Sequence, residues 1–160
     1  MTAIQVNMSV NGLSTSIVTE ASRTLLEVLR EDLHLTGAKD ACGGEGECGA
    51  CTVLLNGVPV NSCMVMIGQM EGCEVETIEG LSGENKPDPI QTAFIEEGAI
   101  QCGYCTPGMV LASKALLDQN PNPDDEQIRT ALAGNLCRCT GYTKIIAAVH
   151  RAAGDLKNGN

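Results

Sequence analysis

The stretch Ile100–Gly108 places two thiols, Cys102 and Cys105, directly before a predicted helix. Thr106 is a residue type favoured at a helix N-cap, Pro107 suits the first helical position, and apolar residues then recur at helical spacing. The free backbone N–H groups of a helix start and the positive end of its dipole attract anions. This pair could therefore bind a metal centre as thiolates.

A second pair, Cys137 and Cys139, also precedes a predicted helix, which begins after Thr140. One face of that helix is apolar, with Ile145, Val149, Ala152 and Leu156. Four thiols thus gather at two helix starts. Such a place favours an anionic cluster of thiolates and inorganic sulfide.

A third group of thiols, Cys42, Cys48 and Cys51, lies in a glycine-rich loop. Glycine has no Cβ and tolerates positive φ, so this backbone can wrap closely and turn its N–H groups toward sulfide. The loop resembles that of plant-type ferredoxins, whose fourth ligand comes from further along the chain. Cys63 fits as the fourth ligand; Cys73 is the alternative, which we interpret as a free, buried cysteine.

Zinc is the competing metal for both sets, because zinc ribbons and iron–sulfur sites share the Cys-x2-Cys spacing. The glycine-rich loop favours iron–sulfur. Neither set needs a histidine, and we interpret His34 and His150 as structural or solvent-facing residues. A Rieske-type site is therefore disfavoured.

The N-terminal half has the pattern of a small mixed sheet. Alternating apolar residues predict a strand over 3–10, and Asn11-Gly12 is a hairpin signal that leads to a return strand over 13–19. Thr24 and Glu27 form a capping box before a helix that carries Leu25, Val28, Leu29 and Leu33. Further strands are predicted over 51–55, 58–62 and 74–78. This order indicates a helix laid across the sheet.

The C-terminal half has a helical pattern. A polar, Gly- and Pro-containing linker over 81–87 separates residues 1–80 from residues 88–160. Four short helices are predicted, starting after Asp88, at Pro107, at Asp124 and after Thr140. The fold class is therefore α+β, with a small four-helix bundle after the sheet.

Composition excludes several classes of function. The 160-residue chain has a formal net charge of −10 and no basic patch interleaved with aromatics, so we expect no nucleic acid partner. It has no apolar run of membrane-spanning length and no signal-peptide pattern, so we expect a cytoplasmic protein without a membrane span. In a reducing compartment, closely spaced cysteines more often bind metal than form disulfides. No Rossmann fingerprint, Walker loop or nucleophile–base arrangement is visible, so we expect no substrate turnover by this chain alone.

Several segments together carry a resemblance to a known family. They are Leu35–Gly37, Glu47–Val53, Gln101–Gly108 and Gly134–Tyr142. The chain resembles the small iron–sulfur subunit of the molybdenum hydroxylases, which include xanthine dehydrogenase, aldehyde oxidoreductase and carbon monoxide dehydrogenase. The resemblance spans nearly the whole chain from the Asn11-Gly12 hairpin onward, and the last two segments together are highly specific.

The resemblance implies an N-terminal ferredoxin-like β-grasp domain with one [2Fe-2S] cluster and a C-terminal helical domain with a second, nearer the molybdenum. The implied ligands are Cys42, Cys48, Cys51 and Cys63 for the first cluster, and Cys102, Cys105, Cys137 and Cys139 for the second. In the family, the position that matches Gln101 contacts the pterin of the molybdenum cofactor, and the surroundings of Cys139 approach it too.

One spacing departs from the family. The family and the plant-type pattern place four residues between the first two ligands, whereas five separate Cys42 from Cys48. An extra glycine in the loop is the simplest explanation. If Cys42 is not a ligand, Cys73 is the next candidate.

The predicted function is electron relay in a multi-subunit molybdenum hydroxylase. The implied partners are a large subunit that binds the molybdopterin cofactor and a medium subunit that binds FAD. The resemblance implies that the complex oxidises an aromatic N-heterocycle, a purine or an aldehyde. One alternative is a protein-interaction module that is stabilised by bound zinc. The other is a free, ferredoxin-like electron carrier.

Overall fold

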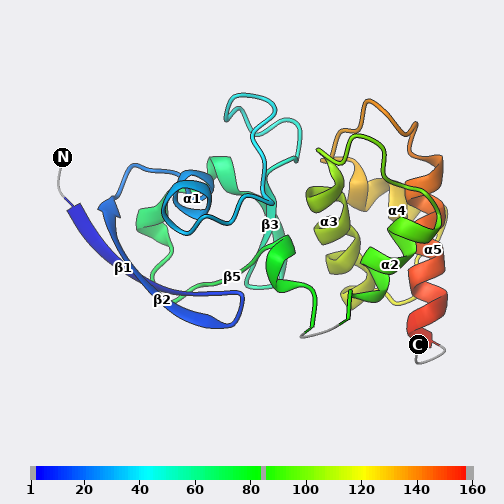
Figure 1. Cartoon of the computed structure of the whole chain (residues 1–160), viewed down its shortest axis with the longest axis horizontal. Coiled ribbons are helices and arrows are strands. Elements are labelled where there is room, and N and C mark those ends of the chain that lie inside the picture. Colours follow the sequence, from blue (N-terminus) through cyan, green and yellow to red (C-terminus); the bar gives the residue numbers. More distant parts are fainter. Residues whose placement is uncertain (1–2, 84–85, 158–160) are drawn as a thin grey trace.

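The computed structural model describes residues 3–83 and 86–157, with a sheet in one half and helices in the other (Figure 1). One mixed sheet has the strand order β2-β1-β5-β3-β4. Its strands are β1 (Ala3–Val10), β2 (Leu13–Glu20), β3 (Thr52–Leu55), β4 (Val58–Asn61) and β5 (Glu74–Glu76). β1 and β5 are parallel, and the other neighbours are antiparallel. The predicted strands and both hairpins are confirmed.

The helix that lies across the sheet starts at the predicted capping box. The Glu27 amide donates to Thr24 Oγ1 at 3.2 Å, and the Thr24 amide donates to Glu27 Oε2 at 2.6 Å. The expectation of one α-helix is wrong beyond this first turn. Helix α1 (Leu25–Glu27) continues as a π-helical turn over Val28–Asp32. The turn is wider because the Leu33 amide bonds the Val28 carbonyl, five residues back, at 3.1 Å.

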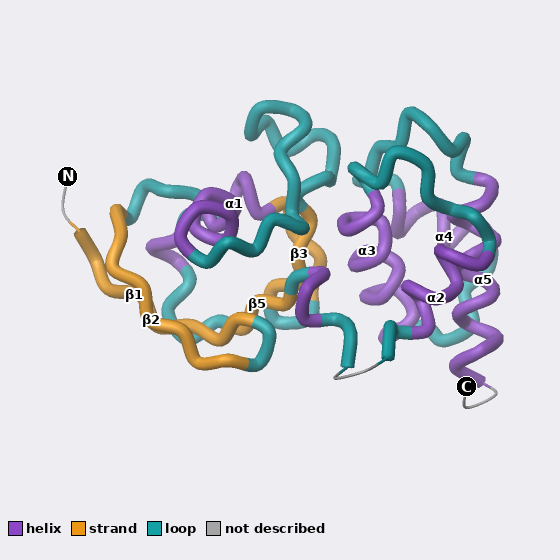
Figure 2. Tube along the Cα trace, viewed as in Figure 1, coloured by secondary structure: helices purple, strands orange, loops and turns teal. Residues whose placement is uncertain are grey.

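The four predicted helices of the second half are present (Figure 2). They are α2 (Pro89–Glu96), α3 (Thr106–Gln119), α4 (Asp125–Leu132) and α5 (Thr143–Lys157). Asp88 is the N-cap of α2 and Asp124 is the N-cap of α4, each in a capping box. Thr106 is not the N-cap, because the backbone of Cys105 is already helical at φ −82° and ψ −13°. Helix α3 therefore starts one residue earlier than predicted.

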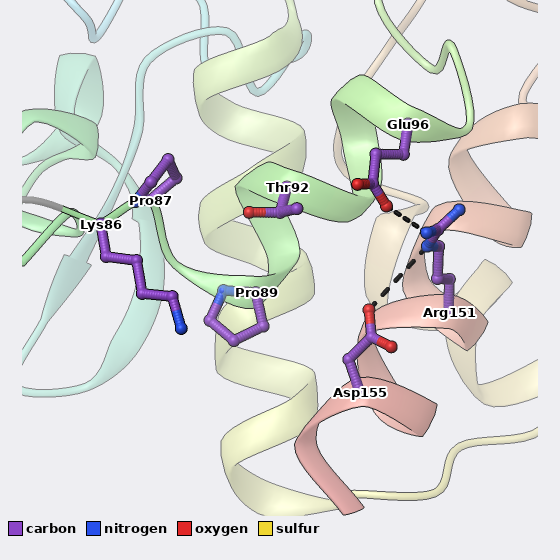
Figure 3. Close-up of a pocket in the computed structure, with 7 residues that line it drawn as sticks. All are labelled: Lys86, Pro87, Pro89, Thr92, Glu96, Arg151 and Asp155. Carbon is purple, nitrogen blue, oxygen red and sulfur yellow. Dashed lines mark ion pairs between the residues drawn. The ribbon is translucent and has the colours of Figure 1, made fainter. Parts of the chain in front are cut away.

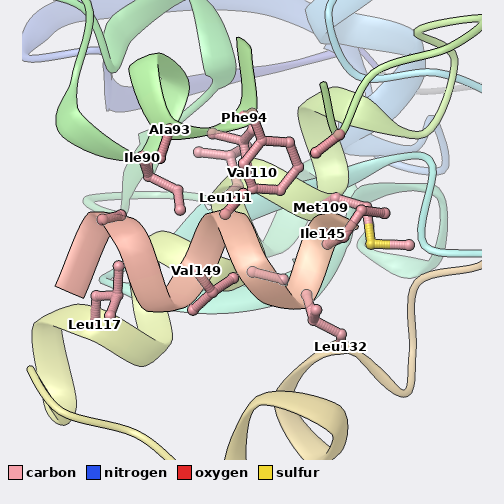
Figure 4. Packing of buried hydrophobic residues seen from close by; sticks show 14 of the residues in the cluster. Ile90, Ala93, Phe94, Met109, Val110, Leu111, Leu117, Leu132, Ile145 and Val149 are labelled. Atoms are coloured by element: carbon pink, nitrogen blue, oxygen red, sulfur yellow. The ribbon is translucent and has the colours of Figure 1, made fainter. Parts of the chain in front are cut away.

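Two groups of buried apolar residues meet at β3. Side chains from the sheet and α1 form the first core, which includes Val53. The four helices form the second, around Phe94, Met109 and Ile145 (Figure 4). Leu54 belongs to this second core, because successive side chains of a strand point to opposite faces.

The sequence predicts a linker over 81–87 between the two halves. Residues 84 and 85 of that linker lie outside the described residues, and the division into residues 1–80 and 88–160 stays a prediction. Within residues 3–83 and 86–157, none of the helices combines the length and hydropathy that a bilayer crossing requires.

Removing the ring of Phe94 should destabilise the helical half. Phe94 is 1% exposed, so Phe94→Ala should lower the free energy of unfolding by about 3–5 kcal/mol through lost burial and a cavity. Urea denaturation followed by far-UV circular dichroism measures this change. The neighbouring Ile95→Ala is the control, because Ile95 is 64% exposed. Equal losses in the two variants would contradict the packing described above.

Candidate metal centres

The first cysteine set lies in the loop before β3 and in the turn after β4. The Sγ atoms of Cys51 and Cys63 are 3.4 Å apart, and both residues are buried. The thiols of Cys42 and Cys48 are hydrogen-bonded to each other and half-buried. The structure thus brings together all four predicted ligands as two pairs.

The backbone of this loop turns its N–H groups toward sulfur. Hydrogen bonds from the backbone of Glu47, Cys48 and Glu45 reach Cys42. Positive φ angles of 75° at Gly43 and 84° at Gly44 permit this path, which other residue types rarely adopt. The loop therefore offers donors to a negatively charged centre.

The second cysteine set joins the starts of α3 and α5. Cys102 and Cys139 are exposed, and their Sγ atoms lie 3.5 Å apart. Cys105 and Cys137 are half-buried free cysteines, and their side chains are in hydrogen-bond contact. These four thiols also form two contacting pairs, and each pair joins a cysteine before α3 to a cysteine before α5.

Two side chains after the last cysteine surround Cys137. Thr140 donates to Cys137 Sγ through its hydroxyl at 3.1 Å and its amide at 3.4 Å. The Cys137 amide donates to the Tyr142 hydroxyl at 2.8 Å. Tyr142 itself holds a positive φ of 67°. This turn therefore fixes both the backbone and the charge environment of Cys137.

The surroundings of Cys42 and Cys48 shift the pKa values of these two thiols in opposite directions. Hydrogen bonds from the Glu47 backbone and from the Cys48 thiol lower the pKa of Cys42 to about 7. Burial raises the pKa of Cys48. Burial and then the contact with Cys51 raise the pKa of Cys63 to about 12. Metal binding must therefore release protons from the sulfurs whose pKa is raised.

The second set shows the same separation. Burial raises the pKa of Cys105 to about 12. Burial acts to raise the pKa of Cys137 as well, but the hydrogen bonds from Thr140 and its neighbours outweigh it and lower the pKa. The backbone of Tyr104 lowers the pKa of Cys102, whereas the contact with Cys102 raises the pKa of Cys139.

The paired thiols fit dinuclear clusters better than single ions. A [2Fe-2S] cluster is held by four thiolates, which two irons share as two pairs. A structural zinc ion needs four ligands around one point. The geometry therefore favours the dinuclear cofactor.

Four other residues singled out from the sequence do not belong to these thiol pairs. Cys73 is half-buried rather than fully buried, because it stands at the start of the short strand β5, and its Sγ contacts backbone carbonyls. His34 is exposed, and His150 Nε2 lies 2.6 Å from Asp125 Oδ1. Gln101 is exposed beside Cys102.

A hollow beside α2 and α5 has no part in this chemistry (Figure 3). It is lined by Lys86, Pro87, Pro89, Thr92, Glu96, Arg151 and Asp155. Arg151 pairs there with Glu96 and Asp155, so its charge is already balanced. None of these lining residues is a cysteine.

Comparison with known proteins identifies the class of these two centres. Residues 8–88 match the family model described as a 2Fe-2S iron-sulfur cluster binding domain, and residues 77–150 match the [2Fe-2S] binding domain. Both halves of the chain are thus [2Fe-2S]-binding domains.

Individual relatives narrow this class. The chain is 55% identical to the nicotinate dehydrogenase small FeS subunit of Eubacterium barkeri, over 95% of this chain and 96% of that protein. It is 47% identical to a probable xanthine dehydrogenase subunit of Bacillus subtilis, over 97% and 88%. The structure of quinoline 2-oxidoreductase from Pseudomonas putida contains a chain with a TM-score of 0.93 and 39% identity, with 98% of each chain covered. The chain belongs to the iron–sulfur subunits of the molybdenum hydroxylase family.

Sequence reasoning missed the supporting residues around the thiols. Thr140 and Asn135 both lie in the segment Gly134–Tyr142, which the sequence analysis selected for its cysteines. The residues next to them in the sequence do not predict the hydrogen bonds that their side chains form. Asn135 is 6% exposed, and its amide bonds residues of the sheet half. Only the assembled structure shows these contacts.

The substitution Cys42→Ser tests whether Cys42 is a cluster ligand. We expect Cys42→Ser to lose one of two [2Fe-2S] clusters, because a thiolate is removed from the pair with Cys48. Iron and sulfide content per chain and the visible absorption spectrum measure the loss. Cys73→Ser is the matched control and should keep both clusters. The reverse result, with clusters lost only in Cys73→Ser, would transfer the ligand role to Cys73.

Proposed function

We propose that this chain is the electron-transfer subunit of a multi-subunit molybdenum hydroxylase. It carries single electrons from a molybdopterin cofactor in a large subunit to FAD in a medium subunit. The observation that carries the proposal is the presence of two sets of four thiols, each arranged as two contacting pairs, in a chain of this family. When bound, [2Fe-2S] clusters supply the one-electron redox chemistry.

In this proposal the thiols are the cluster ligands, and the surrounding groups set their charge. The ligands are Cys42, Cys48, Cys51 and Cys63 in the first set, and Cys102, Cys105, Cys137 and Cys139 in the second. The backbone around Cys42 and the hydroxyl of Thr140 donate to sulfur. These donors stabilise added negative charge, and so they favour acceptance of an electron.

The exposure of the second cysteine set supports a direction for electron transfer between the subunits. Cys102 and Cys139 are exposed, and so is Gln101 beside them. We therefore place the molybdopterin of the large subunit against this surface, near Gln101 and Cys139. The FAD subunit then accepts electrons from the first set.

The relatives support an aromatic N-heterocycle as the substrate of the complex. Two of them are named for nicotinate and quinoline. The large subunit selects the substrate in this proposal, since this chain contributes electron transfer alone. All nine cysteines lie in the described residues and are outside any disulfide, which supports a reducing, cytoplasmic location.

Low-temperature EPR of the anaerobically isolated, dithionite-reduced protein tests this function. We expect two distinguishable spin-one-half signals that total about two spins per chain, one from each reduced cluster. Co-purification with two larger subunits is expected in the same preparation. Stoichiometric zinc without a signal would favour the interaction module, and two signals in a chain that never associates with larger subunits would favour a free carrier.

The hydroxyl of Thr140 should raise the reduction potential of the second cluster. Its hydrogen bond to Cys137 Sγ stabilises the more negative, reduced state. Thr140→Val should therefore lower that potential by roughly 40 mV, the one-electron equivalent of about 1 kcal/mol for a net hydrogen bond. An EPR-monitored redox titration measures the shift.

Thr130→Val is the control for this substitution, because Thr130 is exposed on α4. It should leave both potentials unchanged. A Thr140→Val protein with the wild-type potential would show that the hydroxyl does not act on the cluster.

A further inference from the structure

The two cysteine loops contact each other directly across the boundary between the halves. The Leu136 amide donates to the Cys48 carbonyl at 2.9 Å, which joins a residue of the first set to the neighbour of Cys137. The Tyr104 hydroxyl, between Cys102 and Cys105, donates to the Asp40 carbonyl at the start of the other loop. Figure 2 shows both loops rising on the same side of the molecule.

Asn135 makes the buried part of this contact. Its side-chain amide nitrogen donates to the Gly49 carbonyl at 2.9 Å and to Thr52 Oγ1 at 3.0 Å. Asn135 is 6% exposed, and Thr52 is 3% exposed. The side-chain NH2 group of Asn135 therefore joins the two halves through both of its hydrogen bonds. Gly49 directly follows Cys48, and Asn135 lies two residues before Cys137.

Two glycines let the backbones approach closely at this point. A Cβ on Gly49 would lie 2.3 Å from the Gly134 carbonyl oxygen, and one on Gly108 would lie 2.3 Å from the Gly49 carbonyl oxygen. Both distances are far below van der Waals contact. We call the contact formed by Cys48, Gly49, Gly108, Asn135 and Leu136 the loop junction.

We propose that Asn135 is a positioning residue, which together with Gly49 and Gly108 fixes the distance between the two cluster sites. This inference rests on the proposed function, because it concerns electron transfer between two bound clusters. The tunnelling rate falls steeply with distance, so small changes in separation change the rate. The loop junction sets the separation at the ligand loops themselves, independently of the linker over 81–87.

The first test adds one methyl group to the loop junction. Gly108→Ala places a Cβ against the Gly49 carbonyl, so the loops must move apart. Alanine is more favourable than glycine inside a helix, so a weakened helix would not explain the effect. Gly154→Ala is the matched control, since it also lies in a helix but its Cβ would meet nothing within 4 Å.

The measurement is the magnetic interaction between the two reduced clusters, read as splitting and relaxation of the EPR signals in the isolated complex. This dipolar interaction falls with the cube of the separation. We expect Gly108→Ala to retain both signals at wild-type spin counts and to lose part or all of the splitting. Gly154→Ala should have the wild-type spectrum.

The second test removes the hydrogen bonds without adding bulk. Asn135→Ala leaves the Gly49 carbonyl and the Thr52 hydroxyl without this donor and should also reduce the splitting. Asn122→Ala is its control, because Asn122 is an exposed asparagine of the same half.

The outcomes separate this inference from the proposed function. A wild-type protein without two clusters contradicts the proposed function. Wild-type splitting in either Gly108→Ala or Asn135→Ala, with both clusters present, overturns the positioning role alone. Loss of a cluster in both variants, with both controls intact, also overturns it, because the loop junction would then serve cluster assembly rather than spacing.

Discussion

The structure depends on one electrostatic constraint. Thiolate sulfurs that are removed from bulk water must accept hydrogen bonds from protein donors in place of water. The chain meets this constraint mainly with its own backbone. The loop around Cys42 turns several N–H groups inward, and Tyr104 supplies a backbone N–H to Cys102 in the same way. Because backbone donors are fixed by φ and ψ, the path of each loop is fixed with them.

This constraint explains why so little aromatic core is needed. Phe94 is the single phenylalanine, and the chain has no tryptophan. The two cores are built mostly from aliphatic side chains, and each is small. Small cores give limited stability by burial alone. In the proposed holoprotein, cluster binding by loops that also join the two halves would add stability where the apolar interior is thin.

Features set by nearby residues could be predicted from the sequence. The predicted capping box at Thr24 and the predicted helix starts at Asp88 and Asp124 each depend on residues within one helical turn, and all three are present. The division of eight cysteines into two sets followed from the family resemblance, whereas the contacts of Cys102 with Cys139 and of Cys105 with Cys137 join distant segments and were not predicted. The π-helical turn after Glu27 and the contacts of Asn135 could not be predicted, because they depend on packing between distant segments.

The alternation of β3 has a consequence for unfolding. Val53 and Leu54 are adjacent in the chain but belong to different cores. Unfolding of the sheet half would withdraw Leu54 from the helices, and loss of the helices would leave that side chain facing water. A four-residue strand therefore couples the two halves thermodynamically, and the protein should melt in one cooperative transition although its chain contains two cluster-binding units.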